Sequence, residues 1–182
     1  MNTNLRSLKR TQKGFTVLRK AESSPNDLCS HCCMNGNCTY QKDIKKISEE
    51  SNIQVNLSHC PHYIMPILFR DETGLNCDSF NTMRMGGAFS RRLKILDTIG
   101  LVNKKDEVIN YAKVTDVLLL DKHTALTNHA KYNHMLIEQD LPHEEAAEKL
   151  AKILRNNYGN LVFTNNDQIS ILNVQIIREN SV

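Results

Sequence analysis

Five of the six cysteines of this 182-residue chain lie close together, between positions 29 and 60. The first two are spaced C-x-x-C, and a third follows the second directly. Another comes after a short loop, and the last precedes a proline. Thiolates at such spacings can converge on one metal ion, and four sulfur ligands are typical of structural zinc sites. The predicted zinc ligands are Cys29, Cys32, Cys38 and Cys60.

The same spacing is compatible with other ligands and with another cofactor. Cys33 is the spare thiol of the cluster. Three nearby histidines could replace a cysteine, because imidazole also binds zinc: His31, His59 and His62. A four-cysteine iron–sulfur cluster is an alternative that the spacing leaves open. No open coordination position is evident, so the module is predicted to be structural rather than catalytic.

The composition limits the compartment and the partners that we expect. Apolar residues make up 40% of the chain, which is enough for a folded core. No apolar stretch is long enough to span a bilayer, and the first residues lack the apolar region of a secretory signal. We therefore expect a cytoplasmic protein with no membrane partner, where clustered cysteines favour a metal over disulfides.

Residues 1–27 are interpreted as a basic arm. The first twenty residues contain no acidic side chain and these basic ones: Arg6, Lys9, Arg10, Lys13, Arg19 and Lys20. Such an arm can neutralise phosphates and add salt-dependent affinity for nucleic acid. A solvated terminus without a ligand explains the composition equally well. Because aromatic residues make up only 5% of the chain, a broad stacking platform for single strands is not expected.

A second set of candidate binding residues follows the cysteines. If a helix begins near Met83, Arg84 and Arg91 lie two turns apart on one face, where they can hold a phosphate. A solvated basic helix is the alternative. Tyr111 lies on a predicted strand and could stack on a base, although core tyrosines are as common. The predicted nucleic-acid contacts are Arg84, Arg91, Tyr111 and Lys113.

Five other residues are interpreted as structural. Four histidines in a polar helical stretch show no convergent spacing, so we expect them at the surface: His123, His129, His134 and His143. Cys77 is isolated in the sequence and is expected to be a packed thiol.

A small set of helices and strands must position these residues. Short apolar or alternating runs predict strands at 15–18, 53–57, 64–69, 98–102, 108–117 and 168–176. Helical spacing predicts helices at 42–51, 126–137 and 142–158, with a short helix within 80–93. Pro66 indicates that its strand lies at a sheet edge. This order of elements predicts an α+β fold with mostly antiparallel strands.

Several of these segments follow the order of a known family. They are 64–69, 79–84, 96–101, 111–117 and 147–158. Residues 63–178 resemble an ASCH domain, a member of the PUA-like superfamily. The resemblance implies a small PUA-like β-barrel flanked by helices, with a cleft where the signature segment meets the barrel mouth. It also implies binding of RNA or nucleotides, and a few small members hydrolyse acylated cytidine with a lysine, a threonine and a glutamate.

The chain departs from the family signature, which reads G-x-K-x-x-E-x-R or G-x-K-T-x-T-x-R. With the final arginine aligned on Arg84, Cys77 replaces the glycine and Ser79 replaces the lysine. Thr82 stands at the position of the glutamate or the second threonine. The missing lysine argues against hydrolysis, because an unactivated hydroxyl is a poor nucleophile.

The sequence therefore predicts three parts: the arm 1–27, a cysteine-rich metal-binding module 28–62, and an ASCH/PUA-like domain 63–182. We expect a protein that binds RNA or a modified nucleotide and contains a structural Zn2+ site. One alternative is a nucleoside amidohydrolase acting on acylated cytidine, with Thr82 as the nucleophile. The other is a protein-interaction module, in which the zinc segment docks a protein partner.

Overall fold

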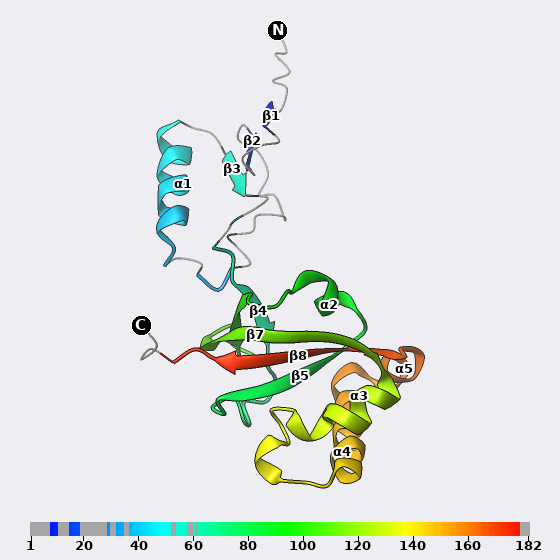
Figure 1. Cartoon of the computed structure of the whole chain (residues 1–182). Helices are drawn as coiled ribbons and strands as arrows, with labels where there is room; N and C mark the ends of the chain where they lie inside the picture. Colours follow the sequence, from blue (N-terminus) through cyan, green and yellow to red (C-terminus); the bar gives the residue numbers. More distant parts are fainter. Residues whose placement is uncertain are drawn as a thin grey trace. The chain divides into compact units, whose positions relative to one another are not determined.

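The computed structural model describes residues 8–10, 15–18, 29, 32–34, 37–51, 54–57, 60 and 62–178 (Figure 1). The chain divides into two compact units, Met1–Pro66 and Ile67–Val182. The predicted boundaries between arm, cysteine module and domain, after residues 27 and 62, stay predictions.

The first unit contains a small antiparallel sheet and one helix. The strands are β1 (Leu8–Arg10), β2 (Phe15–Leu18) and β3 (Gln54–Leu57), in the order β1-β2-β3. The helix α1 spans Thr39–Glu50, between β2 and β3 in the sequence. The predicted strands at 15–18 and 53–57 and the predicted helix at 42–51 are therefore confirmed. None of the residues of α1 is buried.

The second sheet has five strands in the order β4-β6-β7-β8-β5. Their bounds are Met65–Leu68 (β4), Ser79–Met85 (β5), Thr98–Val102 (β6), Val108–Asp121 (β7) and Gln168–Ile176 (β8). The pairs β6–β7, β7–β8 and β8–β5 are antiparallel. Pro66 lies on the edge strand β4, as predicted, where its missing N–H costs no ladder hydrogen bond.

The predicted closed β-barrel is wrong, because the sheet is open and has β4 and β5 as its edges. The outer edge of β5 bonds to a loop rather than to β4. The backbone N–H of His134 donates to the carbonyl of Asn81 at 3.0 Å, within a parallel bridge between Asn81 and Asn133. This loop therefore pairs with the outer edge of β5 at Asn81.

The helices of the second unit have these bounds: α2 Ala88–Arg92, α3 Lys122–His129, α4 His143–Tyr158 and α5 Asn160–Asn165. Two 3-10 turns, η2 (Ala130–Tyr132) and η3 (Ile137–Gln139), connect α3 to α4. The helix predicted at 142–158 is confirmed, whereas the one predicted at 126–137 is only partly helical. Figure 1 shows α3, α4 and α5 together at the end of the sheet where β7 ends and β8 begins.

The short helix predicted within 80–93 is confirmed as α2, but no helix begins near Met83. Met83 and Arg84 belong to β5, which pairs with β8 along its whole length. The strand stops at Gly86, whose φ of 77° is in the region that glycine tolerates best. The short helix α2 begins only at Ala88, so the predicted helical face with Arg84 and Arg91 does not exist.

The core of the second unit lies between the sheet and the helices. Leu150 of α4 is buried in one cluster with Ile169 and Ile171 of β8 and with Met83 of β5. Burying each large aliphatic side chain contributes roughly 1.5–3 kcal/mol relative to leaving it exposed. This packing fixes α4 against the strands that position the site described below.

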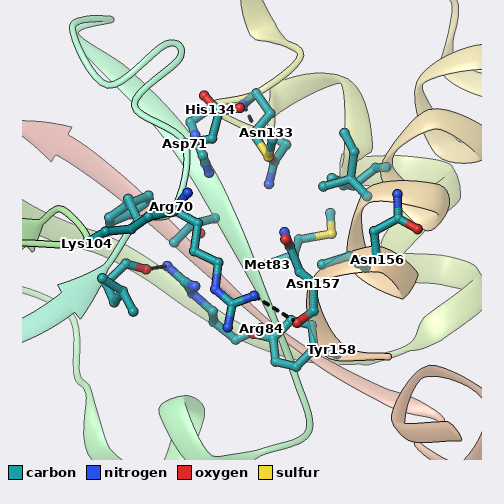
Figure 2. Close-up of a pocket in the computed structure, with 17 residues that line it drawn as sticks. Arg70, Asp71, Met83, Arg84, Lys104, Asn133, His134, Asn156, Asn157 and Tyr158 are labelled. Atoms are coloured by element: carbon teal, nitrogen blue, oxygen red, sulfur yellow. Dashed lines mark hydrogen bonds between the residues drawn. The ribbon is translucent and has the colours of Figure 1, made fainter. Parts of the chain in front are cut away.

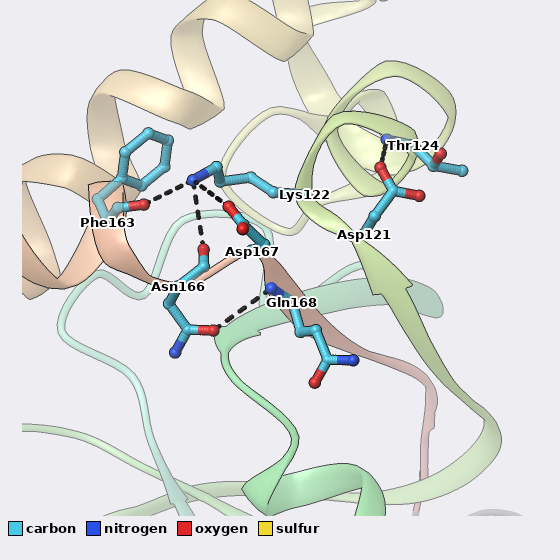
Figure 3. A network of polar contacts seen from close by, with 7 residues as sticks. All are labelled: Asp121, Lys122, Thr124, Phe163, Asn166, Asp167 and Gln168. Carbon is cyan, nitrogen blue, oxygen red and sulfur yellow. Dashed lines mark hydrogen bonds and ion pairs between the residues drawn. The ribbon is translucent and has the colours of Figure 1, made fainter.

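A lysine joins α3 to the end of α5 (Figure 3). The Nζ atom of Lys122 donates to the carbonyl oxygens of Phe163, at 2.7 Å, and Asn166, at 3.3 Å. It lies 3.6 Å from a carboxylate oxygen of Asp167 and 4.9 Å from the centre of the Phe163 ring. A cation at the carbonyl end of a helix is favourable, so Lys122 stabilises the segment that leads into β8.

Candidate functional site

A pocket of about 900 Å³ lies between the two edge strands of the open sheet (Figure 2). β4 and the turn after it form one wall, and β5 forms another. The C-terminal half of α4 and the loop after η2 complete the lining. The open sheet is therefore what creates the pocket, since paired edges would close it.

Arg84 spans the gap between the two edges. Its Nη2 atom donates to the carbonyl oxygen of Leu68, the last residue of β4, at 2.8 Å. The guanidinium carbon lies 5.0 Å from the ring centre of Phe69 and 5.9 Å from that of Phe89. Contacts of this kind with aromatic faces favour a cation. Arg84 thus holds the edges apart at a fixed separation and places its charge in the pocket.

The charge of Arg84 is not matched by an acidic side chain. Among the described residues, its Nε atom is buried without a hydrogen-bond partner, and its guanidinium forms no ion pair with a carboxylate. Burial lowers the pKa of Arg84, while the neighbouring Tyr158 acts in the opposite direction. Arginine nevertheless stays protonated in proteins. The pocket therefore contains a half-buried cation whose Nε atom still has donor capacity.

The other charged residues of the pocket add to its excess of positive charge. Arg70 and Lys104 also line it, and Arg70 donates to the carbonyl oxygen of Asn157 in the last turn of α4 at 3.3 Å. The only acidic lining residue in the described part of the chain is Asp71. Its carboxylate accepts hydrogen bonds from the backbone and side chain of Thr73, which lower its pKa. The pocket is suited to an anion.

His134 is part of the pocket and not a surface histidine, so that prediction is wrong. Its side chain packs edge-on against the rings of Phe69 and Phe80, with ring centres 5.0 and 5.8 Å away, and the residue is 6% exposed. Its Nδ1 atom lies 3.0 Å from the carbonyl oxygen of Thr73. Burial lowers the pKa of His134 to about 4, so the imidazole is neutral at physiological pH.

The turn at 71–74 brings the chain close to His134. Gly74 has a φ of 67°. A Cβ atom at this position would lie 1.9 Å from the backbone oxygen of His134, which is far inside van der Waals contact. Only glycine permits this approach of the turn to the loop that carries His134.

The structure brings together some of the predicted site residues. Thr82 and Arg84 line the pocket from β5, and Thr82 is 2% exposed. Arg91 lies on α2, and Tyr111 and Lys113 lie on β7, outside the pocket lining. The side chain of Lys113 donates instead to the carbonyl of Leu96, at 3.1 Å.

Sequence reasoning missed three pocket residues: Arg70, Lys104 and His134. Arg70 and Lys104 each lie just beyond a strand end, in turns that meet at the pocket only through the order of the strands. His134 carried a signal in retrospect, since it follows an asparagine in a stretch with few turn-forming residues. That pattern alone does not distinguish a buried histidine from an exposed one.

Three of the predicted metal ligands, Cys29, Cys32 and Cys38, precede α1 in the chain, and Cys60 follows β3. Cys29 and Cys32 share one turn, in which the Cys32 N–H donates to the Cys29 carbonyl at 3.3 Å. Cys38 is the N-cap of α1. The sulfur of Cys32 accepts a hydrogen bond from the backbone N–H of Ile64 at 3.5 Å.

The described residues do not include three or more His, Cys, Asp or Glu side chains placed to hold one metal ion. The four predicted ligands are described, whereas His31 and His59 are not. Zinc and the iron–sulfur alternative therefore stay predictions. Cys77 is half-buried, with its sulfur 3.8 Å from a carboxylate oxygen of Glu138, and burial raises the pKa of its thiol.

No family model matches the chain, and no curated protein matches it in sequence. Two solved structures share part of its arrangement. A protein of the DUF984 family from Enterococcus faecalis has 8% identity and a TM-score of 0.44, over 75% of this chain and 89% of that one. A mutant of the ASCH protein ZmASCH from Zymomonas mobilis has 12% identity and a TM-score of 0.41, over 62% and 71%. At these scores the likeness carries no functional conclusion.

Among the described residues, no helix is long and apolar enough to cross a membrane.

Proposed function

We propose that the pocket binds RNA or a modified nucleotide, with Arg84 holding a phosphate group. The observation that carries this proposal is the half-buried guanidinium of Arg84, whose Nε atom is buried without a hydrogen-bond partner and which has no carboxylate partner among the described residues. Leaving a buried N–H donor without a partner costs roughly 1–3 kcal/mol. A phosphate would offset that cost, since arginine and phosphate form strong charge-assisted hydrogen bonds.

The size and charge of the pocket support the same ligand class. Pockets that bind small molecules typically enclose roughly 300–1,000 Å³, and this one encloses about 900 Å³. Arg70 and Lys104 add positive charge around Arg84. Contacts between such cations and phosphates release counterions, so binding should weaken steeply with salt. RNA is the first ligand to test because the order of segments in residues 63–178, which is similar to that of ASCH domains, implies it.

The test measures the affinity of the full chain for short single-stranded RNA by fluorescence anisotropy, over a series of salt concentrations. Arg84→Met keeps the length and apolar contacts of the side chain but removes its charge. We expect the affinity to fall at least tenfold, given roughly 1.5–3 kcal/mol for a charge-assisted hydrogen bond. The salt dependence should also decrease by about one phosphate contact.

Arg92→Met is the matched control, because Arg92 is an exposed arginine of α2 outside the pocket lining. It should change the affinity little. Equal losses in the two variants would mean that general surface charge, and not the pocket, binds RNA. Thermal unfolding of both variants separates a loss of binding from a loss of structure.

One observation favours the hydrolase alternative: Thr82 lies in the same pocket. Its position in the chain nevertheless lacks the activating lysine, since Ser79 stands where the family has one. We expect no deacylation of acylated cytidine by the purified protein. Turnover that disappears in Thr82→Ala would replace the binding proposal with an enzymatic one.

A further inference from the structure

The two ring nitrogens of His134 differ in their hydrogen-bonding roles: one is a donor and the other an acceptor. A carbonyl oxygen can only accept a hydrogen bond, so the contact of 3.0 Å with the Thr73 carbonyl requires the proton on Nδ1. The neutral ring then has a lone pair on Nε2. In the described part of the chain, Nε2 has no hydrogen-bond partner, and His134 lines the pocket. The pocket therefore contains a fixed hydrogen-bond acceptor beside its cations.

We propose that His134 recognises the base of the bound nucleotide, with Nε2 accepting a hydrogen bond from an exocyclic amino group. Adenine and cytosine have such a group on the edge that proteins read, whereas uracil has a carbonyl oxygen at the corresponding position. This inference rests on the proposed function and adds a base preference to it.

The surroundings of His134 hold the imidazole in one orientation. Its backbone N–H is bonded to Asn81, and Asn81 also donates to the carbonyl of His129 at 2.8 Å. The rings of Phe69 and Phe80 flank the imidazole edge-on, at interplanar angles of 80° and 61°. A side chain held in this way binds a ligand without losing further rotational freedom, which favours specificity.

Arg84 and His134 are close enough to contact one nucleotide. The guanidinium carbon and the imidazole centre each lie 5.0 Å from the centre of the same Phe69 ring. They are therefore no more than twice that distance apart, a separation that the phosphate and base of one nucleotide can bridge. Figure 2 shows both residues around the same pocket.

The charge state of the imidazole decides which base it favours. Two charged groups act on His134: Arg84, which lowers its pKa, and Asp71, which raises it. Burial is the largest influence, and the resulting pKa of about 4 keeps the ring neutral. A protonated ring would donate from both nitrogens and would favour a carbonyl, so the neutral state is what selects an amino group.

The test compares matched pairs of short single-stranded RNAs on the full-length protein. One RNA of each pair contains adenosine or cytidine, and the other contains the same nucleoside without its exocyclic amino group. We expect the wild-type protein to bind the amino-bearing RNA about tenfold more tightly, since an acceptor left unpaired in a pocket costs that much. The salt dependence should be the same for both RNAs.

Two variants of His134 remove the preference in different ways. His134→Phe keeps the ring packing and loses both nitrogens. His134→Asn keeps a donor for the Thr73 carbonyl but lacks an acceptor at the position of Nε2. Both should bind the two RNAs of a pair equally, with an unchanged salt slope. If His134→Phe fails to fold, His134→Asn still gives the result.

The outcomes separate this inference from the proposal on which it rests. An equal affinity of the wild-type protein for both RNAs, with binding still sensitive to Arg84→Met, would overturn the role of His134 alone. So would a preference that persists in His134→Asn. Binding that ignores Arg84→Met, or no binding of any RNA, would overturn the proposed function and this inference with it.

Discussion

The two units of the chain differ in how deeply their described side chains are buried. In Met1–Pro66, no described side chain is buried, and Tyr40 and Ile47 of α1 are about half exposed. In Ile67–Val182, large side chains such as Leu150, Ile169 and Ile171 are inaccessible to solvent. The second unit can fold by burying apolar surface, whereas the described part of the first buries too little to do so.

This difference explains where chemistry can occur in each unit. A partly desolvated site strengthens charge interactions, so a half-buried cation such as Arg84 can select an anion. The first unit has no comparable core in its described residues. A small segment of this kind usually needs a disulfide or a metal to fold, and its clustered cysteines are the residues that could supply a metal site.

We expect the largest effect when metal is removed from the protein, an experiment that tests the contrast between the two units. We expect purified protein to contain one equivalent of zinc, and a strong chelator to unfold α1 and the sheet β1-β2-β3. Binding of structural zinc contributes roughly 10–16 kcal/mol in small zinc-binding modules, enough to decide whether such a segment folds. Elemental analysis measures the metal, and limited proteolysis after chelation should cut before residue 67 while Ile67–Val182 stays intact.

A pair of cysteine variants provides the control for this prediction. Cys38→Ser should lower the zinc content, whereas Cys77→Ser, which changes a half-buried thiol of the other unit, should leave it unchanged. Iron together with visible absorption would replace zinc by an iron–sulfur cluster. Protein that contains no metal and resists proteolysis would show that the first unit folds without one.

The next effect tests the turn that supports His134 in the second unit. Gly74→Ala places a Cβ atom against the His134 backbone oxygen at a positive φ, so we expect a loss of about 3–5 kcal/mol in the free energy of unfolding. Gly159→Ala is the control, because Gly159 also has a positive φ but open space around it. It should cost about 1–3 kcal/mol, from backbone strain alone. Urea denaturation measures both, and equal losses would contradict the importance of the close approach.

A pH effect of intermediate size follows from the buried His134. Its pKa is about 4 in the folded protein, below the ordinary value of 6.5, so the unfolded chain binds more protons between these pH values. Stability should therefore fall as the pH drops from 6.5 to 4, by about 3 kcal/mol from this residue. Urea denaturation at several pH values should show a smaller fall in the free energy of unfolding for His134→Phe than for the wild-type protein. The same dependence on pH in both proteins would contradict a buried, neutral His134.

The smallest expected effect concerns the lysine that joins α3 to α5. Lys122→Met removes two hydrogen bonds to carbonyl oxygens while keeping most of the apolar stem. We expect a loss of about 1–2 kcal/mol in the free energy of unfolding, since such bonds contribute modestly. Lys152→Met, on the exposed surface of α4, should change it by less than about 0.5 kcal/mol. If Lys122→Met leaves the free energy of unfolding unchanged, packing alone stabilises the position of α5.

Local patterns were enough to predict most strands and the longest helix. The strands at Thr98–Val102 and Gln168–Ile176 have the predicted bounds, and α4 ends at Gly159 as expected. Alternation and capping residues act within a few positions, so they are visible in sequence. The segment around Met83 was assigned wrongly because its apolar residues fit a short helix as well as a strand buried on both faces.

The site was harder to predict than the fold, because it depends on contacts between distant segments. Arg84 was identified through its place in a family signature, but its strand, its aromatic neighbours and its contact with Leu68 were not foreseen. The burial of His134 depends on the turn that contains Gly74, sixty positions earlier in the chain. Closure of the barrel was predicted by resemblance, whereas the sheet is open and a loop pairs with the outer edge of β5 at Asn81.

The most direct test of the account is the salt-dependent affinity of Arg84→Met for single-stranded RNA, measured beside Arg92→Met by fluorescence anisotropy. The account predicts at least a tenfold loss for Arg84→Met, a salt slope lower by about one contact, and little change for Arg92→Met. An affinity and slope equal to those of the wild-type protein, in an Arg84→Met variant that folds normally, would contradict it.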